Sequence, residues 1–324
     1  MTNQATISIA LAAYNGKKYI AQQLESLLKQ TRLPDEIVIC DDSADDLTYQ
    51  ALEPFLSSGL IKYIKNPQPL GVVKNFEKAI NNCTGEYIFL CDQDDVWLPE
   101  KVEILANTLY ENPTVDGVFC NSFLVDENLV KLNKTLWDIR KFTNQMQKTL
   151  AAGDALKVFC RRVTCSSHNT AFKRRALEYI MPFPELEPFY PDTWIAFSIA
   201  LNGSWEAINQ CLTLYRVHTA NQSTPLASNV SAARKARSSS VARRNYLLAQ
   251  ELLKRKKSAK QANIHLLEKF ALHHKNRSEY SCNVISRTAQ AVREVCTLRY
   301  CHCSNGVRTF AADILFHTPP NNAG

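Results

Sequence analysis

The order of apolar and amphipathic segments in the first 125 residues limits the folds open to this chain more than any other feature. Short apolar runs alternate with stretches in which apolar residues recur at helical spacing. The apolar runs, each expected to be a strand, cover residues 7–11, 37–40, 61–65, 87–91 and 118–120. Strands that alternate with helices are joined by right-handed crossovers. We therefore expect an α/β protein with a Rossmann-like, mainly parallel sheet flanked by helices.

The rest of the chain is less regular. We expect an insertion without regular structure over residues 126–153, a strand over 163–173, a helix over 192–201, two strands over 205–208 and 212–215, and helices beyond 229. A stretch containing Pro and Ser at residues 224–229 marks a boundary. The predicted organisation is a domain over residues 1–228, with halves 1–125 and 126–228, followed by a basic helical region over 229–324.

Charge and cysteine content bear on location and partners. The eleven cysteines are an odd number scattered through the expected strands and helices, which favours a reducing cytoplasm over a secreted disulfide framework. The formal charge of +7 is uneven, because residues 231–260 hold ten Lys or Arg and one acid, Glu251. This run is either a solvated helix face or a patch for anionic lipid. Each basic residue near an anionic leaflet contributes about 1 kcal/mol, so the second interpretation predicts peripheral attachment to the inner face of the cytoplasmic membrane.

Polar residues follow the predicted strands where a ligand would bind, beyond the carboxyl ends of the sheet. Asp41 and Asp42 follow the second strand, and Asp92, Asp94 and Asp95 follow the fourth. Three carboxylates within four residues repel one another unless protons or a cation neutralise them. Mg²⁺ and Mn²⁺ prefer such oxygen ligands. Aspartates here could instead cap the helix that begins after Pro99, so the cluster alone leaves both interpretations open.

Six short motifs in the first third of the chain carry a resemblance to a known family. They are Ala12-Ala13-Tyr14-Asn15-Gly16, Gln30-Thr31, Asp35-Glu36-Ile37, Asp41-Asp42-Ser43, Gly71 with Asn75-Phe76, and Gly85-Glu86-Tyr87 leading into Asp92-Gln93-Asp94-Asp95-Val96-Trp97. In this order and spacing they resemble the family 2 glycosyltransferases. The family often has Gly after its paired acids, whereas Ser43 and Ala44 follow here. The resemblance implies an A-type glycosyltransferase fold with a helical C-terminal extension.

The resemblance also implies the residues of a donor site. The predicted nucleotide-sugar ligands are Ala12, Tyr14, Asn15, Asp42, Lys74, Asp92 and Asp94, and the predicted metal ligands are Asp94, Asp95 and His218. By family analogy Asp42 contacts the base, and Asp92 and Asp94 hold the ribose and a Mn²⁺ or Mg²⁺ ion. Lys74 is otherwise an ordinary solvated lysine. His218 stands in a segment similar to one near the active site of related bacterial enzymes, and it is either a metal or diphosphate contact or a structural residue.

Asp192 is the predicted catalytic base. The segment Tyr190-Pro191-Asp192-Thr193-Trp194 matches the place where the family carries its catalytic acid, although the usual preceding Glu or His is Pro191 here. An acid at a helix start is also favoured by the helix dipole without any catalytic role. With Asp192 as base and the ion as Lewis acid, a single in-line displacement would invert the anomeric carbon.

The predicted function is inverting transfer of a sugar from a nucleotide-diphosphate donor, a UDP-hexose or dTDP-rhamnose, to a hydroxyl of a growing bacterial surface glycan. The predicted acceptor is a glycan or a lipid-diphosphate-linked glycan, an anionic membrane surface is a further partner, and no nucleic acid is expected. A nicotinamide enzyme is disfavoured because no G-x-G-x-x-G follows the first strand. Two alternatives stay open: an aspartyl-phosphate phosphotransferase with Asp92 as nucleophile, and a non-enzymatic membrane-binding adaptor.

Overall fold

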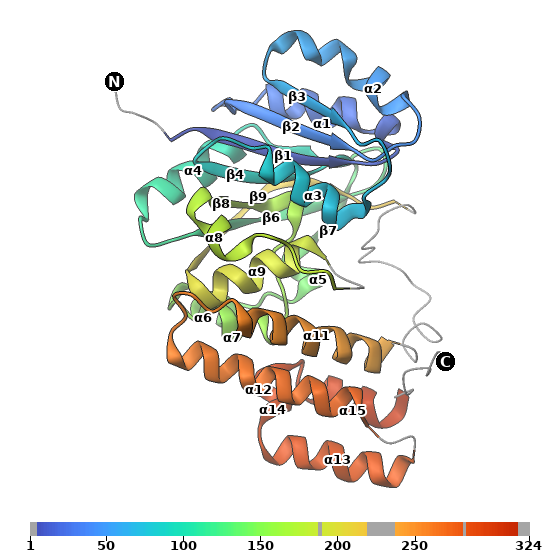
Figure 1. The fold of residues 1–324 in the computed structure, drawn as a ribbon, viewed down its shortest axis with the longest axis vertical. Coiled ribbons are helices and arrows are strands. Elements are labelled where there is room, and N and C mark those ends of the chain that lie inside the picture. Colours follow the sequence, from blue (N-terminus) through green and yellow to red (C-terminus); the bar gives the residue numbers. More distant parts are fainter. Residues whose placement is uncertain (1–4, 187–189, 219–236, 281–282, 317–324) are drawn as a thin grey trace.

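The computed structural model of this protein describes residues 5–186, 190–218, 237–280 and 283–316. Within these residues a nine-stranded sheet has the order β3-β2-β1-β4-β8-β6-β9-β5, and β7 pairs with β6 (Figure 1). The strands are β1 (Ile7–Ala13), β2 (Glu36–Asp41), β3 (Ile61–Lys65), β4 (Tyr87–Asp92), β5 (Val96–Trp97), β6 (Gly117–Val125), β7 (Lys131–Thr135), β8 (Thr170–Lys173) and β9 (Trp205–Arg216). β1 to β4 pair in parallel, as do β6 and β9, whereas β8 runs antiparallel between β4 and β6.

Helices cover both faces of the sheet. In the first 186 residues they are α1 (Ile20–Leu28), α2 (Leu47–Leu52), α3 (Gly71–Asn81), α4 (Lys101–Glu111), α5 (Leu136–Arg140), α6 (Asn144–Ala151), α7 (Ala155–Phe159) and α8 (Leu177–Ile180). The later helices are α9 (Pro191–Asn202), α11 (Arg237–Lys254), α12 (Gln261–Ser278), α13 (Val284–Cys296), α14 (Arg299–Cys303) and α15 (Val307–Phe316). Figure 1 shows α9, α11, α12 and α13 stacked in succession away from the sheet.

Two apolar cores explain why the strands are apolar along their whole length. Ile9 and Leu11 of β1 belong to the core under α1 and α4, whereas Ala10 belongs to the core under α3 and α9. Because both faces of these strands are buried, the sequence shows continuous apolar runs in place of alternation. The predicted parallel α/β half is confirmed, and its polar strand ends meet at one edge of the sheet.

The expected unstructured insertion at residues 126–153 is wrong, because this segment contains β7, α5 and α6. Thr135 caps α5 through a reciprocal pair of hydrogen bonds with Asp138. Trp137 and Phe142 are buried against Phe119 of β6, with ring centroids 5.9 and 5.7 Å from its ring. The segment is polar in sequence because β7 and much of α6 face solvent, while a few aromatic residues fix it to the sheet.

Two strand predictions in the second half also differ from the structure. The strands expected at 205–208 and 212–215 are one strand, β9, whose register against β6 shifts between Ile208 and Cys211. The strand expected over 163–173 is only β8, because Ser167–Asn169 form a turn of 3₁₀ helix before it. Both differences arise from local irregularities that pairing with β6 tolerates.

The C-terminal helices are joined to the α/β part by a shared core. Leu252 of α11 and Phe270 of α12 pack in the same buried cluster as Trp194 and Phe197 of α9. α13 to α15 surround a smaller cluster that includes Tyr280 and Tyr300. The predicted boundary at residues 224–229 lies outside the described residues. None of the described helices combines the length and the apolar content needed to cross a bilayer.

Candidate active site

A cavity of about 1040 Å³ lies beyond the carboxyl ends of β1, β2 and β4. Its wall contains all but two of the predicted site residues, namely Ala12, Tyr14, Asn15, Asp42, Asp92, Asp94, Asp192 and His218. Lys74 is not part of the wall, and its ammonium group lies 2.7 Å from Glu77 on the same helix. Asp95 is also outside the wall and is fully buried. The structure therefore brings predicted site residues from Ala12 to His218 together around one cavity.

The paired acids after β2 have different surroundings. Asp41 is fully buried, where it accepts hydrogen bonds from the Ser43 hydroxyl and the Tyr63 hydroxyl at 2.5 and 2.8 Å. Asp42 lines the cavity and accepts hydrogen bonds from Asn66 Nδ2 at 2.6 Å and the Gly71 backbone N–H at 2.8 Å. Gly71 has φ of +79°, a conformation that disfavours any other residue. Asp41 thus supports the loop, and Asp42 is the member available to a ligand.

The loop after β1 is fastened to the acidic loop by Gln93. Gln93 accepts a hydrogen bond from the Tyr14 backbone N–H at 2.9 Å and donates one to the Tyr14 carbonyl at 2.8 Å. A Cβ at Gly16 would lie 2.5 Å from Gln93 Oε1, so a larger residue here would displace the Gln93 amide from Tyr14. Asn75 donates to the carbonyls of Ala13 and Cys40 at 3.1 and 3.0 Å. These contacts hold the ends of β1, β2 and β4 in one rigid rim.

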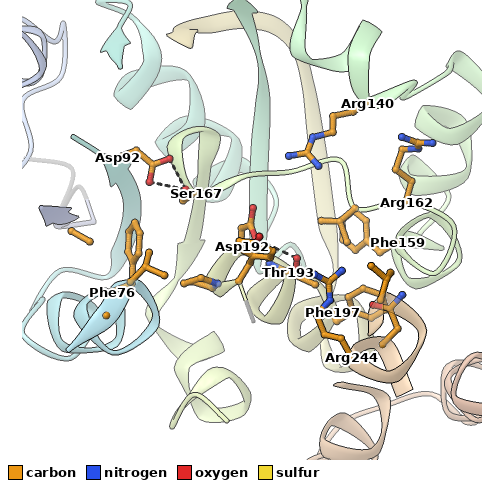
Figure 2. Close-up of a pocket in the computed structure, with 18 of the residues that line it drawn as sticks. Phe76, Asp92, Arg140, Phe159, Arg162, Ser167, Asp192, Thr193, Phe197 and Arg244 are labelled. Carbon is orange, nitrogen blue, oxygen red and sulfur yellow. Dashed lines mark hydrogen bonds between the residues drawn. The ribbon is translucent and has the colours of Figure 1, made fainter. Parts of the chain in front are cut away.

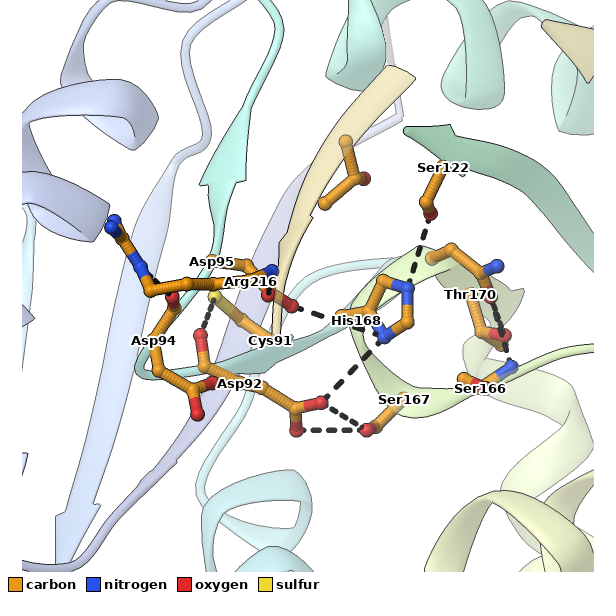
Figure 3. Close-up of polar contacts among 12 residues, drawn as sticks. Cys91, Asp92, Asp94, Asp95, Ser122, Ser166, Ser167, His168, Thr170 and Arg216 are labelled. Atoms are coloured by element: carbon orange, nitrogen blue, oxygen red, sulfur yellow. Dashed lines mark hydrogen bonds and ion pairs between the residues drawn. The ribbon is translucent and has the colours of Figure 1, made fainter. Parts of the chain in front are cut away.

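The three carboxylates after β4 point in three directions (Figure 3). Both Asp92 oxygens lie 2.7 Å from Ser167 Oγ at the cavity wall. Asp94 Oδ2 lies 2.9 Å from His218 Nε2, also at the wall. Asp95 points inward, where its Oδ1 accepts a hydrogen bond from the Arg216 backbone N–H at 3.0 Å and its Oδ2 has no hydrogen-bond partner among the described residues.

His168 joins this acidic cluster and was not predicted from the sequence. Its Nδ1 lies 3.8 Å from both Asp92 Oδ2 and Asp95 Oδ2, while its Nε2 lies 3.1 Å from Ser122 Oγ. Asp92, Asp95 and His168 form a group of described residues that could hold a metal ion. No sequence motif marks His168, because only the turn before β8 brings it to the end of β4.

Arg216 fixes the path of the acidic loop from the far end of β9. Its Nε donates to the Asp94 carbonyl at 2.8 Å, and another nitrogen donates to Gln22 Oε1 at 2.5 Å. The guanidinium also lies 4.5 Å from the centre of the Tyr19 ring. Arg216 stands in the same family-like segment as His218, and the sequence predicted no role for it. The structure shows that it positions Asp94 and Asp95.

Burial and mutual repulsion perturb the acids of this cluster. Burial, followed by the charge of Asp94, raises the pKa of Asp92 to about 7 and the pKa of Asp95 well above its usual value. Burial lowers the pKa of the neighbouring Lys101 to about 8 and that of His168 well below its usual value. The cluster therefore holds protons near neutrality, and a bound cation would displace them.

Asp192 stands at the start of α9, directly after Pro191, on the same cavity. Its Oδ1 accepts a hydrogen bond from the Thr193 backbone N–H at 2.6 Å (Figure 2). The indole of Trp194 is buried and donates to the Ile180 carbonyl at 2.7 Å, which fixes this end of the helix. Burial raises the pKa of Asp192, and the charges of Arg140 and Arg244 oppose that rise. Sequence reasoning missed both arginines, which approach from α5 and α11.

Comparison with known proteins agrees with this geometry. The family model for glycosyl transferase family 2 matches residues 8–181, more than half of the chain. Over 125 residues the chain is 28% identical to the Escherichia coli UDP-Glc:alpha-D-GlcNAc-diphosphoundecaprenol beta-1,3-glucosyltransferase WfgD, covering 38% of this chain and 48% of that protein. The similarity thus spans about half of the relative's length.

Solved structures resemble the fold over most of the chain. Residues 1–349 of S. aureus TarS in complex with UDP-GlcNAc give a TM-score of 0.60 at 17% identity, covering 95% of this chain and 88% of that one. The Pyrobaculum calidifontis mannosyltransferase PcManGT in complex with GDP-Man and Mn²⁺ gives 0.55 at 21% identity, covering 91% and 76%. The matched family model shows that the chain belongs to glycosyl transferase family 2, and its sheet topology and structural neighbours show that it has the A-type glycosyltransferase fold.

Proposed function

We propose that this protein transfers a sugar, with inversion, from a nucleotide-diphosphate donor to a hydroxyl of a lipid-linked surface glycan. The observation that carries the proposal is a single cavity whose wall contains Asp42, Asp92 and Asp94 at the sheet edge together with Asp192 on α9. One space can therefore hold a donor and an acceptor at once. Membership in the family argues against the phosphotransferase and the adaptor.

The donor occupies the end of the cavity formed by β1, β2 and β4. Asp42 binds the base, its carboxylate already oriented by Asn66 and Gly71. Ala12, Tyr14 and Asn15 line the same end and supply backbone groups and surface to the nucleotide. The UDP-GlcNAc and GDP-Man named for the two structural neighbours support a nucleotide-sugar donor of this class.

A divalent cation, Mn²⁺ or Mg²⁺, fits the acidic end of this cavity. The possible ligands are carboxylate oxygens and an imidazole. Asp95 Oδ2 accepts no hydrogen bond from the described residues, and the pKa of Asp92 is raised, as expected for crowded carboxylates that a cation would stabilise. Asp92, Asp94 and His218, which face the cavity, would hold the cation, and Asp95 and His168 lie behind them in the interior. When bound, the cation neutralises the diphosphate leaving group as a Lewis acid.

Asp192 takes the proton from the acceptor hydroxyl. Its carboxylate is held by Thr193 at a fixed helix end, and the arginines nearby favour its ionised form. A base that faces the acceptor, across from the leaving group, activates the hydroxyl for direct attack on the anomeric carbon. That geometry gives a single displacement, so the product carries the inverted configuration.

The C-terminal helices hold the protein at an anionic membrane surface, where lipid-linked acceptors reside. On α13 to α15 large apolar side chains are exposed, among them Ile285 at 81% and Val307 at 79%. Residues 283–314 contain two acids, Glu294 and Asp313, and both are buried and paired with arginines, Arg299 and Arg277 respectively. The exposed part of this surface is thus apolar and basic, a combination that favours anionic bilayers. The lipid-diphosphate acceptor named for the Escherichia coli relative supports this location.

Donor binding and turnover test the proposal. Melting temperature is measured with UDP-glucose, UDP-GlcNAc, GDP-mannose and dTDP-rhamnose, each with and without Mn²⁺, and release of the nucleoside diphosphate is then followed with the stabilising donor. We expect one donor class to stabilise the protein in a cation-dependent way and to be turned over. If no nucleotide sugar stabilises the protein and no diphosphate is released, the proposed function is refuted.

A further inference from the structure

Four arginines gather at the Asp192 end of the cavity. Arg140 comes from the end of α5, Arg161 and Arg162 follow α7, and Arg244 comes from α11. Figure 2 shows Arg140, Arg162 and Arg244 around the part of the cavity that Asp192 and Phe159 also border. The group combines segments about a hundred residues apart, so it exists only in the folded chain.

None of these four guanidinium groups forms an ion pair within the part of the chain that the structure describes. Arg162 donates to Asn305 Oδ1 at 3.0 Å, and Arg244 lies 5.7 Å from the centre of the Tyr190 ring. Arg277 lines the same cavity but differs, because it donates to both oxygens of Asp313 at 2.6 and 2.8 Å. Among the described residues, the unpaired positive charge at this end of the cavity therefore comes from Arg140, Arg161, Arg162 and Arg244.

The balance of charge at this end of the cavity calls for an anion. The acids in the cavity wall are Asp42, Asp92 and Asp94 at the donor end, and Asp192. Burial lowers the pKa of Arg162, and the charges of Arg140 and Arg308 lower it further. Burial lowers the pKa of Arg244 as well. Arginines that are partly buried and mutually repelling are stabilised by a ligand with several acceptor oxygens, and a phosphate group is such a ligand.

We propose that this arginine cluster binds a phosphate ester of the acceptor, and so selects acceptors whose sugar is linked to a phosphate or diphosphate. The inference rests on the proposed function, since it assigns the donor to the sheet edge and the acceptor to the Asp192 end. A sugar held through its anomeric phosphate leaves its other hydroxyls free to approach Asp192. The phosphate can belong to a lipid diphosphate or to a phosphodiester in a polymer, since both present the same oxygens to the arginines.

The first test compares acceptors that carry the same sugar and differ in the group that joins it to the alkyl chain. Three probes are used: N-acetylglucosaminyl diphosphate on a short alkyl chain, the same sugar in an alkyl phosphodiester, and its uncharged alkyl glycoside. We expect the ratio of kcat/KM for the diphosphate over the glycoside to fall at least about tenfold in Arg244→Gln, as for loss of one charge-assisted contact. The matched control, Arg243→Gln, changes the exposed neighbour outside this cavity and should keep the wild-type ratio. If wild type has a higher kcat/KM with the diphosphate than with the phosphodiester, the phosphate that the cluster binds belongs to a lipid-type linkage. If kcat/KM is higher with the phosphodiester, it belongs to a polymer.

A second measurement separates this inference from the proposed function. Binding of the alkyl diphosphate sugar is measured by calorimetry with UDP in the donor site, where no transfer occurs. Weaker binding to Arg244→Gln than to Arg243→Gln supports the cluster even if no donor is ever turned over. The proposal is overturned if wild type binds and uses the charged and uncharged acceptors equally well. It is also overturned if Arg244→Gln raises the KM of the donor and leaves that of the acceptor unchanged.

Discussion

Replacing Asp192 with Asn tests the catalytic base directly, because the change removes charge and basicity while preserving shape. Asn retains an oxygen that can accept the 2.6 Å hydrogen bond from the Thr193 backbone N–H, so the start of α9 should persist. Burial raises the pKa of Asp192, and the charges of Arg140 and Arg244 oppose that rise and favour the ionised form. Loss of this proposed base should lower kcat by about 10²- to 10⁴-fold.

The assay is release of nucleoside diphosphate in the presence of an acceptor, together with the melting-temperature shift caused by the donor. Donor binding should survive in Asp192→Asn, because its predicted ligands lie at the sheet edge. Asp154→Asn is the matched control, since Asp154 also lies at the start of a helix but outside the cavity. Its kcat should equal that of wild type.

The pH dependence gives the same test a second readout. Burial raises the pKa of Asp192 above the usual value for an aspartate, so the wild-type rate should fall on the acidic side as this carboxylate takes up a proton. Asp192→Asn should lack that fall. Turnover within about threefold of wild type, with an unchanged acidic limb, would remove Asp192 from the reaction.

Three further predictions concern the cation and the membrane. Asp95→Asn removes a carboxylate whose pKa burial raises well above its usual value in the folded state. The folded state therefore binds a proton that the unfolded state has lost, and without cation the wild-type unfolding free energy should decline as pH rises above the unfolded pKa. Urea titrations at pH 5.5 and pH 8 should show a smaller decline in Asp95→Asn than in wild type. An equal slope in both proteins would contradict it. His218→Gln should lose most of the melting-temperature shift that Mn²⁺ produces with UDP, whereas His265→Gln, an exposed histidine on α12, should keep it; equal shifts would exclude His218 as a ligand. Ile285→Glu should reduce co-sedimentation with anionic phospholipid vesicles, whereas Val130→Glu, at another exposed apolar residue, should not, and equal binding would exclude the α13 surface.

The sequence alone determined the framework of the donor site. The apolar runs that became β1, β2 and β4 are buried on both faces, so they were recognisable without knowledge of the fold. In a parallel sheet the residues after each strand must meet at one edge, and Asp42, Asp92 and Asp94 meet there. The roles assigned to them came from family resemblance and remain predictions.

Tertiary structure decided which acids face the cavity and what surrounds them. Asp94 faces the cavity and Asp95 the interior because Arg216, more than a hundred residues later in the sequence, donates hydrogen bonds to the Asp94 carbonyl and the Asp95 carboxylate. His168 joins the cluster only through a turn before β8, and Arg244 reaches Asp192 only because α11 packs on α9. Contacts between such distant segments leave no periodic trace in the sequence, since they depend on packing of the completed fold and not on the local preference of the chain.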